Sequence, residues 1–321
     1  MPGLASKRTR TMTRNLAASA AMTLLAIPAA AEPIDSLYQV LAEEIIAGKP
    51  VVVSIRVALA DNQHQGIAPV PEALGRGDDP ERNLYWGARY GLLTHLKRSK
   101  RFKLIHHDRL APPGPHGLLE VAVFERRVKP NAAWRRHGVK APFSVYLVGL
   151  AHQGQQFRAA AGQLVRDVWG IGEPLEVRLK DGAILQAGTG ARIVGYMGHN
   201  AYLEPAPPDP DFFSGLSGPV KGRRAGFFLF GCMTRALFAD KLRKPAVFEL
   251  ASTRTLIAPE AYLAEALVDG LAEAEGAETL RRRVVNAYAK YQKIRTVAAG
   301  AVFAPPPVRA PSCPRVIADR P

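Results

Sequence analysis

The chain has 321 residues and a formal net charge of +15, from 43 basic and 28 acidic side chains. This length is enough for one large domain or two small ones. Only two cysteines occur, which excludes a scaffold held together by disulfide bonds and requires a packed hydrophobic core.

The excess positive charge is spread along the chain in short clusters, at residues 97–101, 223–224 and 281–283. Such a surface attracts anionic polymers weakly and without specificity. An arginine-rich composition gives the same excess for no functional reason, and this is the alternative interpretation. None of the clusters is interleaved with aromatic side chains, so we expect no specific nucleic-acid partner.

Residues 1–31 have the three parts of a cleavable secretory signal peptide. Four basic residues, with no acidic residue among them, precede a short apolar run over residues 16–28. The triplet Ala29–Ala31 supplies the small-x-small pattern after which a signal peptidase cuts. The run is shorter than the roughly 20 apolar residues that a membrane-spanning helix needs. We therefore expect export to the periplasm or the extracellular space, no transmembrane segment and a mature charge of +11; an uncleaved anchor is the alternative.

The first half of the mature chain is rich in strand patterns. Its opening run, PVVVSIRVALA, is nearly continuous and β-branched, which is typical of a strand buried on both faces. Asn83 is expected to cap a helix. In chain order we expect a strand over residues 50–60, a loop over 61–82, a helix over 83–96, a strand over 103–107, and a hairpin of strands over 118–128 and 143–152.

The second half alternates helices with short apolar strands. Pro259 is expected to open a helix, because proline is favoured in the first helical turn. In chain order we expect helices over 155–168 and 179–186, strands over 191–197 and 225–230, a helix over 234–242, a strand over 246–251, the helix from Pro259, and a last helix over 277–295.

This alternation predicts an α/β fold with a mostly parallel sheet, helices on both faces and one added hairpin. No linker is long enough to separate two domains, so we expect a single domain over residues 32–300. Residues 301–321 are rich in proline and predict a tail without fixed structure. In sheets of this kind, ligands bind beyond the carboxyl ends of the strands.

Two of the predicted strands end next to side chains of types that can take part in catalysis. The strand at 191–197 runs through a glycine into His199, and the strand at 225–230 runs through a glycine into Cys232. If the strands are parallel neighbours, the imidazole and the thiol leave the sheet at the same edge. A cysteine nucleophile needs such an imidazole as proton acceptor. The alternative is that Cys232 is simply buried and that His199 is an ordinary loop residue.

This arrangement resembles the caspase, legumain and gingipain superfamily of cysteine peptidases. In that superfamily the catalytic histidine follows one apolar strand and the cysteine follows the next, and the 33-residue spacing between His199 and Cys232 is within its range. The resemblance implies a three-layer α/β fold, peptidase-like hydrolysis and no cofactor. Asn200 departs from the pattern, because the superfamily has a glycine after the histidine, where the backbone approaches the substrate.

The loop after the first strand, DNQHQGIAPVP at residues 61–71, is dense in carboxylate, amide and imidazole groups. We expect it at the same sheet edge, where Asp61, Asn62 and Gln65 would orient His199 or hold polar groups of a substrate. A well-ordered, capped turn is the alternative interpretation. This loop and the motif NLYWGARYG also resemble patterns in a set of bacterial proteins of uncharacterised activity.

Three further side chains are candidates for the wall of the same pocket. Tyr85 and Trp86 lie in the NLYWGARYG motif, although aromatic residues at this spacing also suit a core. Glu260 follows the end of a strand and is expected to add to the rim. No motif with metal-ligand spacing occurs, so we expect neither a metal nor a cofactor.

The main hypothesis is therefore an exported cysteine hydrolase, with Cys232 as nucleophile and His199 as general base acting on a peptide. The alternative is a non-catalytic periplasmic protein on the same scaffold, which binds a peptide, a small polar ligand or an anionic envelope polymer. In an oxidising compartment Cys232 either remains a free thiol or pairs with Cys313.

Overall fold

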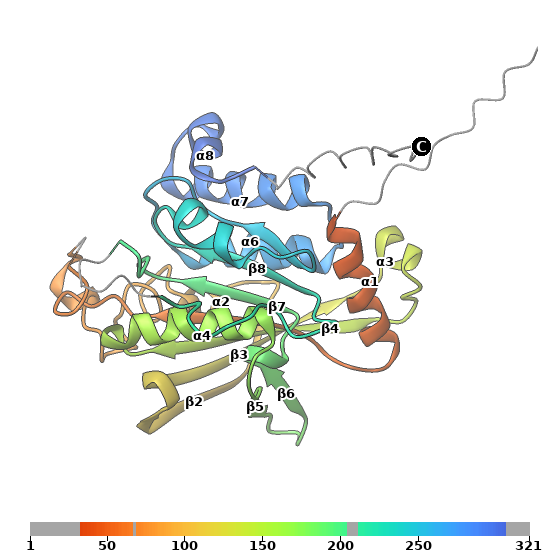
Figure 1. The fold of residues 1–321 in the computed structure, drawn as a ribbon, viewed down its shortest axis with the longest axis horizontal. Helices are drawn as coiled ribbons and strands as arrows, with labels where there is room; N and C mark the ends of the chain where they lie inside the picture. The colour runs from red at the N-terminus through yellow and green to blue at the C-terminus, as the bar shows by residue number, and fades with distance from the viewer. Residues whose placement is uncertain (1–32, 67–68, 204–210, 306–321) are drawn as a thin grey trace, which may run out of the picture. The chain divides into compact units, whose positions relative to one another are not determined.

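A seven-stranded sheet forms the centre of the molecule, in the order β2-β3-β4-β1-β7-β8-β9 (Figure 1). The computed structural model describes residues 33–66, 69–203 and 211–305. The strands are β1 (Val51–Ala58), β2 (Lys103–Gly114), β3 (Leu118–Val128), β4 (Phe143–His152), β7 (Ile193–Met197), β8 (Ala225–Phe230) and β9 (Val247–Ala251).

Five neighbouring strands of the sheet, from β4 through β1 to β9, are parallel. At one side β3 joins β4 in an antiparallel hairpin, and β2 pairs antiparallel with β3. After β1, the next three strands (β2, β3 and β4) all lie on one side of β1. After β7, the next two strands (β8 and β9) lie on the other side. The order of the strands therefore reverses between β1 and β7, which is where parallel sheets of this type bind ligands.

Helices cover both faces of the sheet. Helices α1 (Pro33–Ile46), α2 (Leu92–Lys97), α6 (Ala261–Ala272) and α7 (Ala277–Gln292) contribute to the core on one face, together with α8 (Thr296–Val302). Helix α4 (Phe157–Trp169) and α5 (Asp240–Leu242), which continues a π-helical turn at Arg235–Ala239, cover the other face. The short α3 (Ala132–Arg136) lies between β3 and β4. The expected α/β class, with a mostly parallel sheet and helices on both faces, is confirmed.

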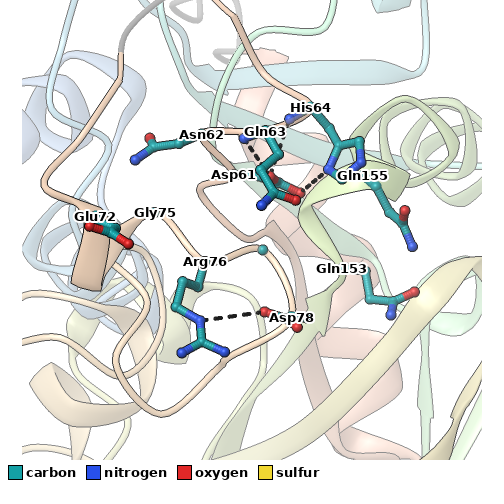
Figure 2. Close-up of a pocket in the computed structure, with 11 residues that line it drawn as sticks. Asp61, Asn62, Gln63, His64, Glu72, Gly75, Arg76, Asp78, Gln153 and Gln155 are labelled. Carbon is teal, nitrogen blue, oxygen red and sulfur yellow. Dashed lines mark hydrogen bonds and ion pairs between the residues drawn. The ribbon is translucent and has the colours of Figure 1, made fainter.

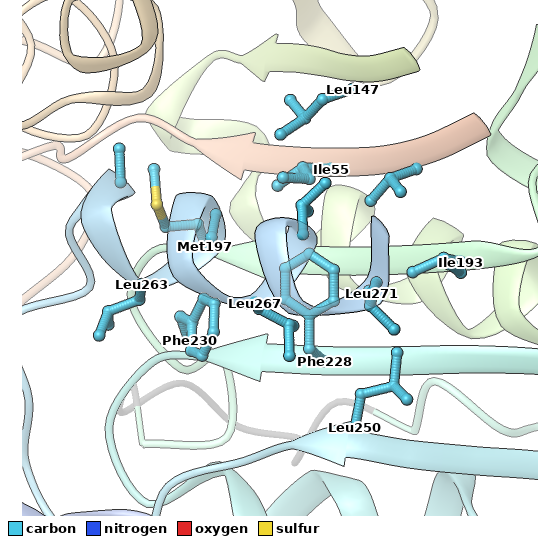
Figure 3. Close-up of a cluster of buried hydrophobic side chains, with 14 of the residues drawn as sticks. Ile55, Leu147, Ile193, Met197, Phe228, Phe230, Leu250, Leu263, Leu267 and Leu271 are labelled. Carbon is cyan, nitrogen blue, oxygen red and sulfur yellow. The ribbon is translucent and has the colours of Figure 1, made fainter. Parts of the chain in front are cut away.

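Strands β1 and β8 are buried on both sides because they are apolar at nearly every position. All eight residues of β1 and all six of β8 are buried. Figure 3 shows how α6 lies across this surface, with Leu263, Leu267 and Leu271 above Phe228 and Phe230 of β8. The spacing of these leucines places them on one face of the helix, which is what packs it on the sheet.

The helix expected over residues 179–186 is wrong. This segment instead connects β5 (Leu175–Arg178) and β6 (Ile184–Ala187), which form a separate antiparallel hairpin. Its turn contains Asp181 and Gly182, and Gly182 has a φ of +89°. An Asp-Gly pair between short apolar runs favours a hairpin turn, and this signal outweighs the helical spacing of the segment.

The helix expected over residues 83–96 is also shorter than predicted, since regular helix is confined to α2. Asn83 does not cap it. Its side-chain amide is buried and bonds instead to the backbone N–H and C=O of Ala60 and to the C=O of Arg76. Asn83 therefore anchors the segment before α2 to the end of β1.

The structure describes neither end of the chain. Residues 1–31, expected to be a signal peptide, and residues 306–321 of the expected tail lie outside the described residues. Phe303 and Ala304 are buried, so packing continues beyond the expected domain end at residue 300. Within the described segments, no helix combines the length and the hydrophobicity needed to cross a bilayer.

Candidate functional site

His199 and Cys232 lie in matching turns at one edge of the sheet. Strands β7 and β8 are parallel neighbours, with Met197 opposite Phe230. The N–H of Gly198 donates to the C=O of Phe230, and a side chain at Gly231 would come within 2.8 Å of the Gly198 oxygen. Only glycine allows this approach, so the two glycines bring the turns together.

The imidazole of His199 is buried against Tyr85. Its Nε2 atom lies 3.3 Å from the Tyr85 hydroxyl, and the two rings meet edge to face. The hydroxyl of Tyr196 donates to the backbone C=O of His199 at 2.8 Å. Burial lowers the pKa of His199 below its ordinary value of 6.5. The ring is therefore neutral at pH 7, the form that can accept a proton.

Cys232 is half-buried and forms no disulfide with any residue that the structure describes. Its Sγ donates a weak hydrogen bond to the C=O of Ile257 at 3.7 Å. Cys313, with which pairing was considered, lies outside the described residues. The residue after the thiol, Met233, has a φ of +51°, in the left-handed region that side chains other than glycine rarely adopt. Such backbone strain is concentrated at functional sites.

Two buried threonines hold the Cys232 turn in this strained shape. Thr253, after β9, donates its hydroxyl to the C=O of Gly231 and accepts the N–H of Thr234 at 3.2 Å. In return the Thr253 N–H donates to the Thr234 hydroxyl at 3.1 Å, and that hydroxyl donates to the C=O of Leu229. We call Thr234 and Thr253 the threonine clamp. Two threonines in separate segments form no motif, so the clamp has no signature in the sequence.

Asn200 links the two turns directly. Its side-chain amide donates to the C=O of Cys232 at 2.8 Å, and its side-chain oxygen accepts the N–H of Tyr202. No hydrogen bond joins the His199 imidazole to the Cys232 thiol among the described contacts, since the first is bonded to Tyr85 and the second to Ile257. The turns are thus joined through Asn200 and not through the imidazole and the thiol.

The Asp61 loop is a rigid, internally bonded turn. The Asp61 carboxylate accepts the N–H groups of Gln63 and His64 and pairs with the His64 Nδ1 at 2.8 Å (Figure 2). Asn62 bonds to the backbone of Val70 through both ends of its amide. Gln65 donates to the C=O groups of Leu59 and Gly154.

None of Asp61, Asn62 and Gln65 has a hydrogen bond to His199; Tyr85 makes that bond instead. The loop does border a polar cavity of about 540 Å³ at the carboxyl ends of β1 and β4. The cavity is lined by Asp61, Asn62, Gln63, His64, Glu72, Gly75, Arg76, Gly77, Asp78, Gln153 and Gln155. Figure 2 shows these side chains arranged around the open space.

Trp86 and Glu260 have different surroundings from those expected of pocket walls. Trp86 is fully buried and donates its ring N–H to Glu120 at 2.6 Å, so it belongs to the core. Glu260 precedes α6 and accepts a hydrogen bond from Gln292 at 3.0 Å. Burial raises the pKa of Glu260. Burial also raises the pKa of Tyr288, with a smaller contribution from the charge of Glu260.

Within the segments that the structure describes, no group of three or more His, Cys, Asp or Glu side chains is arranged to hold a metal ion. Comparison with known proteins finds no matching family model, no matching curated protein and no matching solved structure.

Proposed function

We propose that the protein is a cysteine hydrolase of the peptidase type, with Cys232 as nucleophile and His199 as general base. One observation supports this most directly: the two side chains leave adjacent parallel strands at the same edge, in turns joined by Asn200. This edge also adjoins the reversal of strand order, where α/β sheets bind ligands.

The proposed reaction needs only these two side chains, a peptide and water. The Cys232 thiol gives its proton to the neutral imidazole of His199, and the thiolate attacks the peptide carbonyl. The C–N bond then breaks, the leaving amine takes the proton from the imidazolium, and a thioester remains on Cys232. Water, deprotonated by His199, hydrolyses the thioester and restores the thiol. For the first step His199 exchanges its bond to Tyr85 for one to the thiol.

The strand order supports the resemblance to the caspase, legumain and gingipain superfamily, because a histidine and a cysteine again follow successive parallel strands. Asn200 remains the departure from that pattern. Its amide is occupied by the Cys232 carbonyl and the Tyr202 N–H, so it positions the nucleophile turn rather than standing free.

The test is the rate of Cys232 alkylation by iodoacetamide in a Cys313→Ser background, where Cys232 is the only thiol. We expect a rate at pH 7 at least about tenfold above that of a small thiol, since a paired imidazole raises the thiolate fraction. His199→Ala should remove most of this difference. His137→Ala is the matched control. This histidine is partly exposed and lies between β3 and β4, away from both turns, so its replacement should not change the rate. A rate equal to that of the small thiol, unchanged by His199→Ala, rules the hydrolase out.

The cavity beside the Asp61 loop favours a second candidate, a protein that binds a peptide or small polar ligand without turnover. In that case short polar peptides raise the melting temperature of the wild type and of Cys232→Ser equally, and Asp61→Ala abolishes the rise. Release of cleaved peptide by the wild type but not by Cys232→Ser contradicts it.

We further propose export, on the basis of the signal-peptide pattern in residues 1–31. Sequencing the N-terminus of the protein recovered from the cell envelope fraction tests this. Glu32 is the expected first residue, and an intact N-terminus in the cytoplasmic fraction contradicts export.

A further inference from the structure

A second cavity lies at the opposite edge of the sheet from His199 and Cys232. It has a volume of about 630 Å³ and is bordered by the end of α1, the chain entering β1, the connection from α3 into β4, and the start of β6. Residues before β1 and β4 line it, so it lies at the amino ends of these strands, far from the orange loop after β1 in Figure 1. We call it the amino-edge groove.

The floor of the amino-edge groove is apolar and partly open to solvent. Ile46 is 62% exposed and Ile184 is 38% exposed, which places them among the few large apolar side chains that the described surface leaves open. Phe143 and Tyr146 of β4 are partly buried and add aromatic surface. Apolar side chains from three separate segments thus converge on one concavity, which is the usual form of a small-molecule site.

The charged side chains that line the groove are both basic, and the carboxylate of Glu125, beside the groove, is bonded to the lining residue Ser144. Lys49 and Lys140 line it and are exposed, and none of its lining residues is acidic. Neither ammonium group takes part in an ion pair within the described part of the chain. Two unpaired cations beside an apolar floor complement a molecule with one anionic end and one apolar end.

We infer that the amino-edge groove binds a single-chain anionic amphiphile, such as a fatty acid. The alkyl chain lies along Ile46, Ile184 and Phe143, and the carboxylate lies between Lys49 and Lys140. The volume is in the range of about 300–1,000 Å³ that small-molecule pockets occupy. This site is separate from the candidate active site, so it does not depend on the proposed hydrolase activity.

The test is calorimetric titration of the full chain with sodium dodecanoate below its micelle concentration. We expect one dodecanoate per chain. The double variant Lys49→Gln, Lys140→Gln should weaken binding about tenfold, equivalent to about 1.4 kcal/mol. Dodecyltrimethylammonium, which has the same chain and a cationic head, should bind at least about tenfold more weakly than dodecanoate for the same reason.

Ile184→Asp puts a carboxylate on the floor of the groove and should abolish measurable binding. Ile294→Asp is its matched control, since Ile294 is 40% exposed and does not line the groove, and it should bind like the wild type. Circular dichroism checks that each variant is folded; if Ile184→Asp is not, the lysine variant alone decides.

Three results overturn the inference: no binding of dodecanoate by the wild type, equal binding by the lysine double variant, or equal binding of the cationic amphiphile. A fourth arm uses vesicles of phosphatidylglycerol. Sedimentation with these vesicles, without binding of monomeric dodecanoate, assigns the groove to a membrane surface and also overturns the proposal of a single-chain ligand.

Discussion

His152 shows how strongly the interior of this protein controls the charge of a single side chain. It ends β4 and is fully buried, with its Nε2 atom 3.1 Å from the Arg56 guanidinium and its Nδ1 donating to the C=O of His116. Arg56 in turn pairs with the buried carboxylate of Asp167 at 2.5 Å. Burial, reinforced by the charge of Arg56, lowers the pKa of His152 to about 3.

This shift predicts acid sensitivity that begins close to neutrality. The unfolded chain protonates His152 near its ordinary pKa of 6.5, whereas the folded protein does not until about pH 3. The unfolded state therefore binds more protons between these values, and the free energy of unfolding falls as the pH falls through this window. The expected slope for this one group is about 1.4 kcal/mol per pH unit.

Urea unfolding at pH 7, 6 and 5 measures that slope. His152→Gln keeps a side chain that can accept from Arg56 but does not titrate, so its free energy of unfolding should change less with pH than that of the wild type. An identical pH dependence in both proteins shows that His152 does not cause it.

At the scale of residues, the sequence predicted which side chains lie at the candidate edge but not what they bond. His199 and Cys232 follow recognisable apolar strands, so their placement needs only the direction and order of the strands. The bond from Tyr85 to His199 joins segments more than a hundred residues apart. Long-range contacts of this kind have no local pattern, and therefore Tyr85 was expected to form a wall rather than to hold the imidazole.

At the scale of elements, a side chain of β8 occupies the space that a side chain on β7 would need. Gly195 of β7 is paired with Phe228 of β8, and a β-carbon at Gly195 would lie 2.1 Å from the Phe228 ring. The ring therefore lies over the glycine and fills the space that a larger residue would need. This contact keeps the two strands that carry His199 and Cys232 in register.

Gly195→Ala should destabilise the protein by about 1–3 kcal/mol, because the buried ring must move in a close-packed core. Gly300→Ala in α8 is the control, since the nearest atom to its new methyl group is 3.9 Å away and alanine suits a helix better than glycine. Chemical denaturation of both variants provides the comparison. Equal stability of the two contradicts the proposed packing role of Phe228.

The sequence predicted the strands better than the helices. Buried strands such as β1 and β8 are continuous apolar runs with few alternative interpretations. The segments at 83–96 and 179–186 have helical spacing as well, and there the outcome depended on a turn at Gly182 and on a buried amide at Asn83. Helix α1 was not predicted, because its apolar pattern directly follows that of the signal-like segment.

At the scale of the whole molecule, the segment at the end of α8 packs against the threonine clamp of the candidate site. Phe303 is almost completely buried and forms a β-bridge with Thr253, one member of the threonine clamp. The N–H of Arg254 donates to the C=O of Val302 at 2.7 Å, and the N–H of Ala304 donates to the C=O of Ser252 at 3.0 Å. The segment after β9 is therefore fixed on one side by the Cys232 turn and on the other by residues 302–304.

Phe303→Ala should cost about 3–5 kcal/mol of stability, the usual cost of removing a buried aromatic ring. It should also change the alkylation rate of Cys232, because without the buried ring residues 302–304 are held less firmly against the backbone of Thr253. Thermal unfolding and the iodoacetamide assay measure the two effects. A destabilised variant whose Cys232 reacts at the wild-type rate under folding conditions shows that the clamp is independent of Phe303.

The bridge between Thr253 and Phe303 has a consequence for the order of events in the life of the chain. A polypeptide leaves the ribosome from its N-terminus, so Cys232 and Thr253 emerge before Phe303. The turn that presents the thiol acquires its full support only after residues 302–304 have followed and folded back. We therefore expect the thiol of Cys232 to reach its final geometry late in folding, after residues 302–304 have been synthesised and have paired with the segment at Thr253.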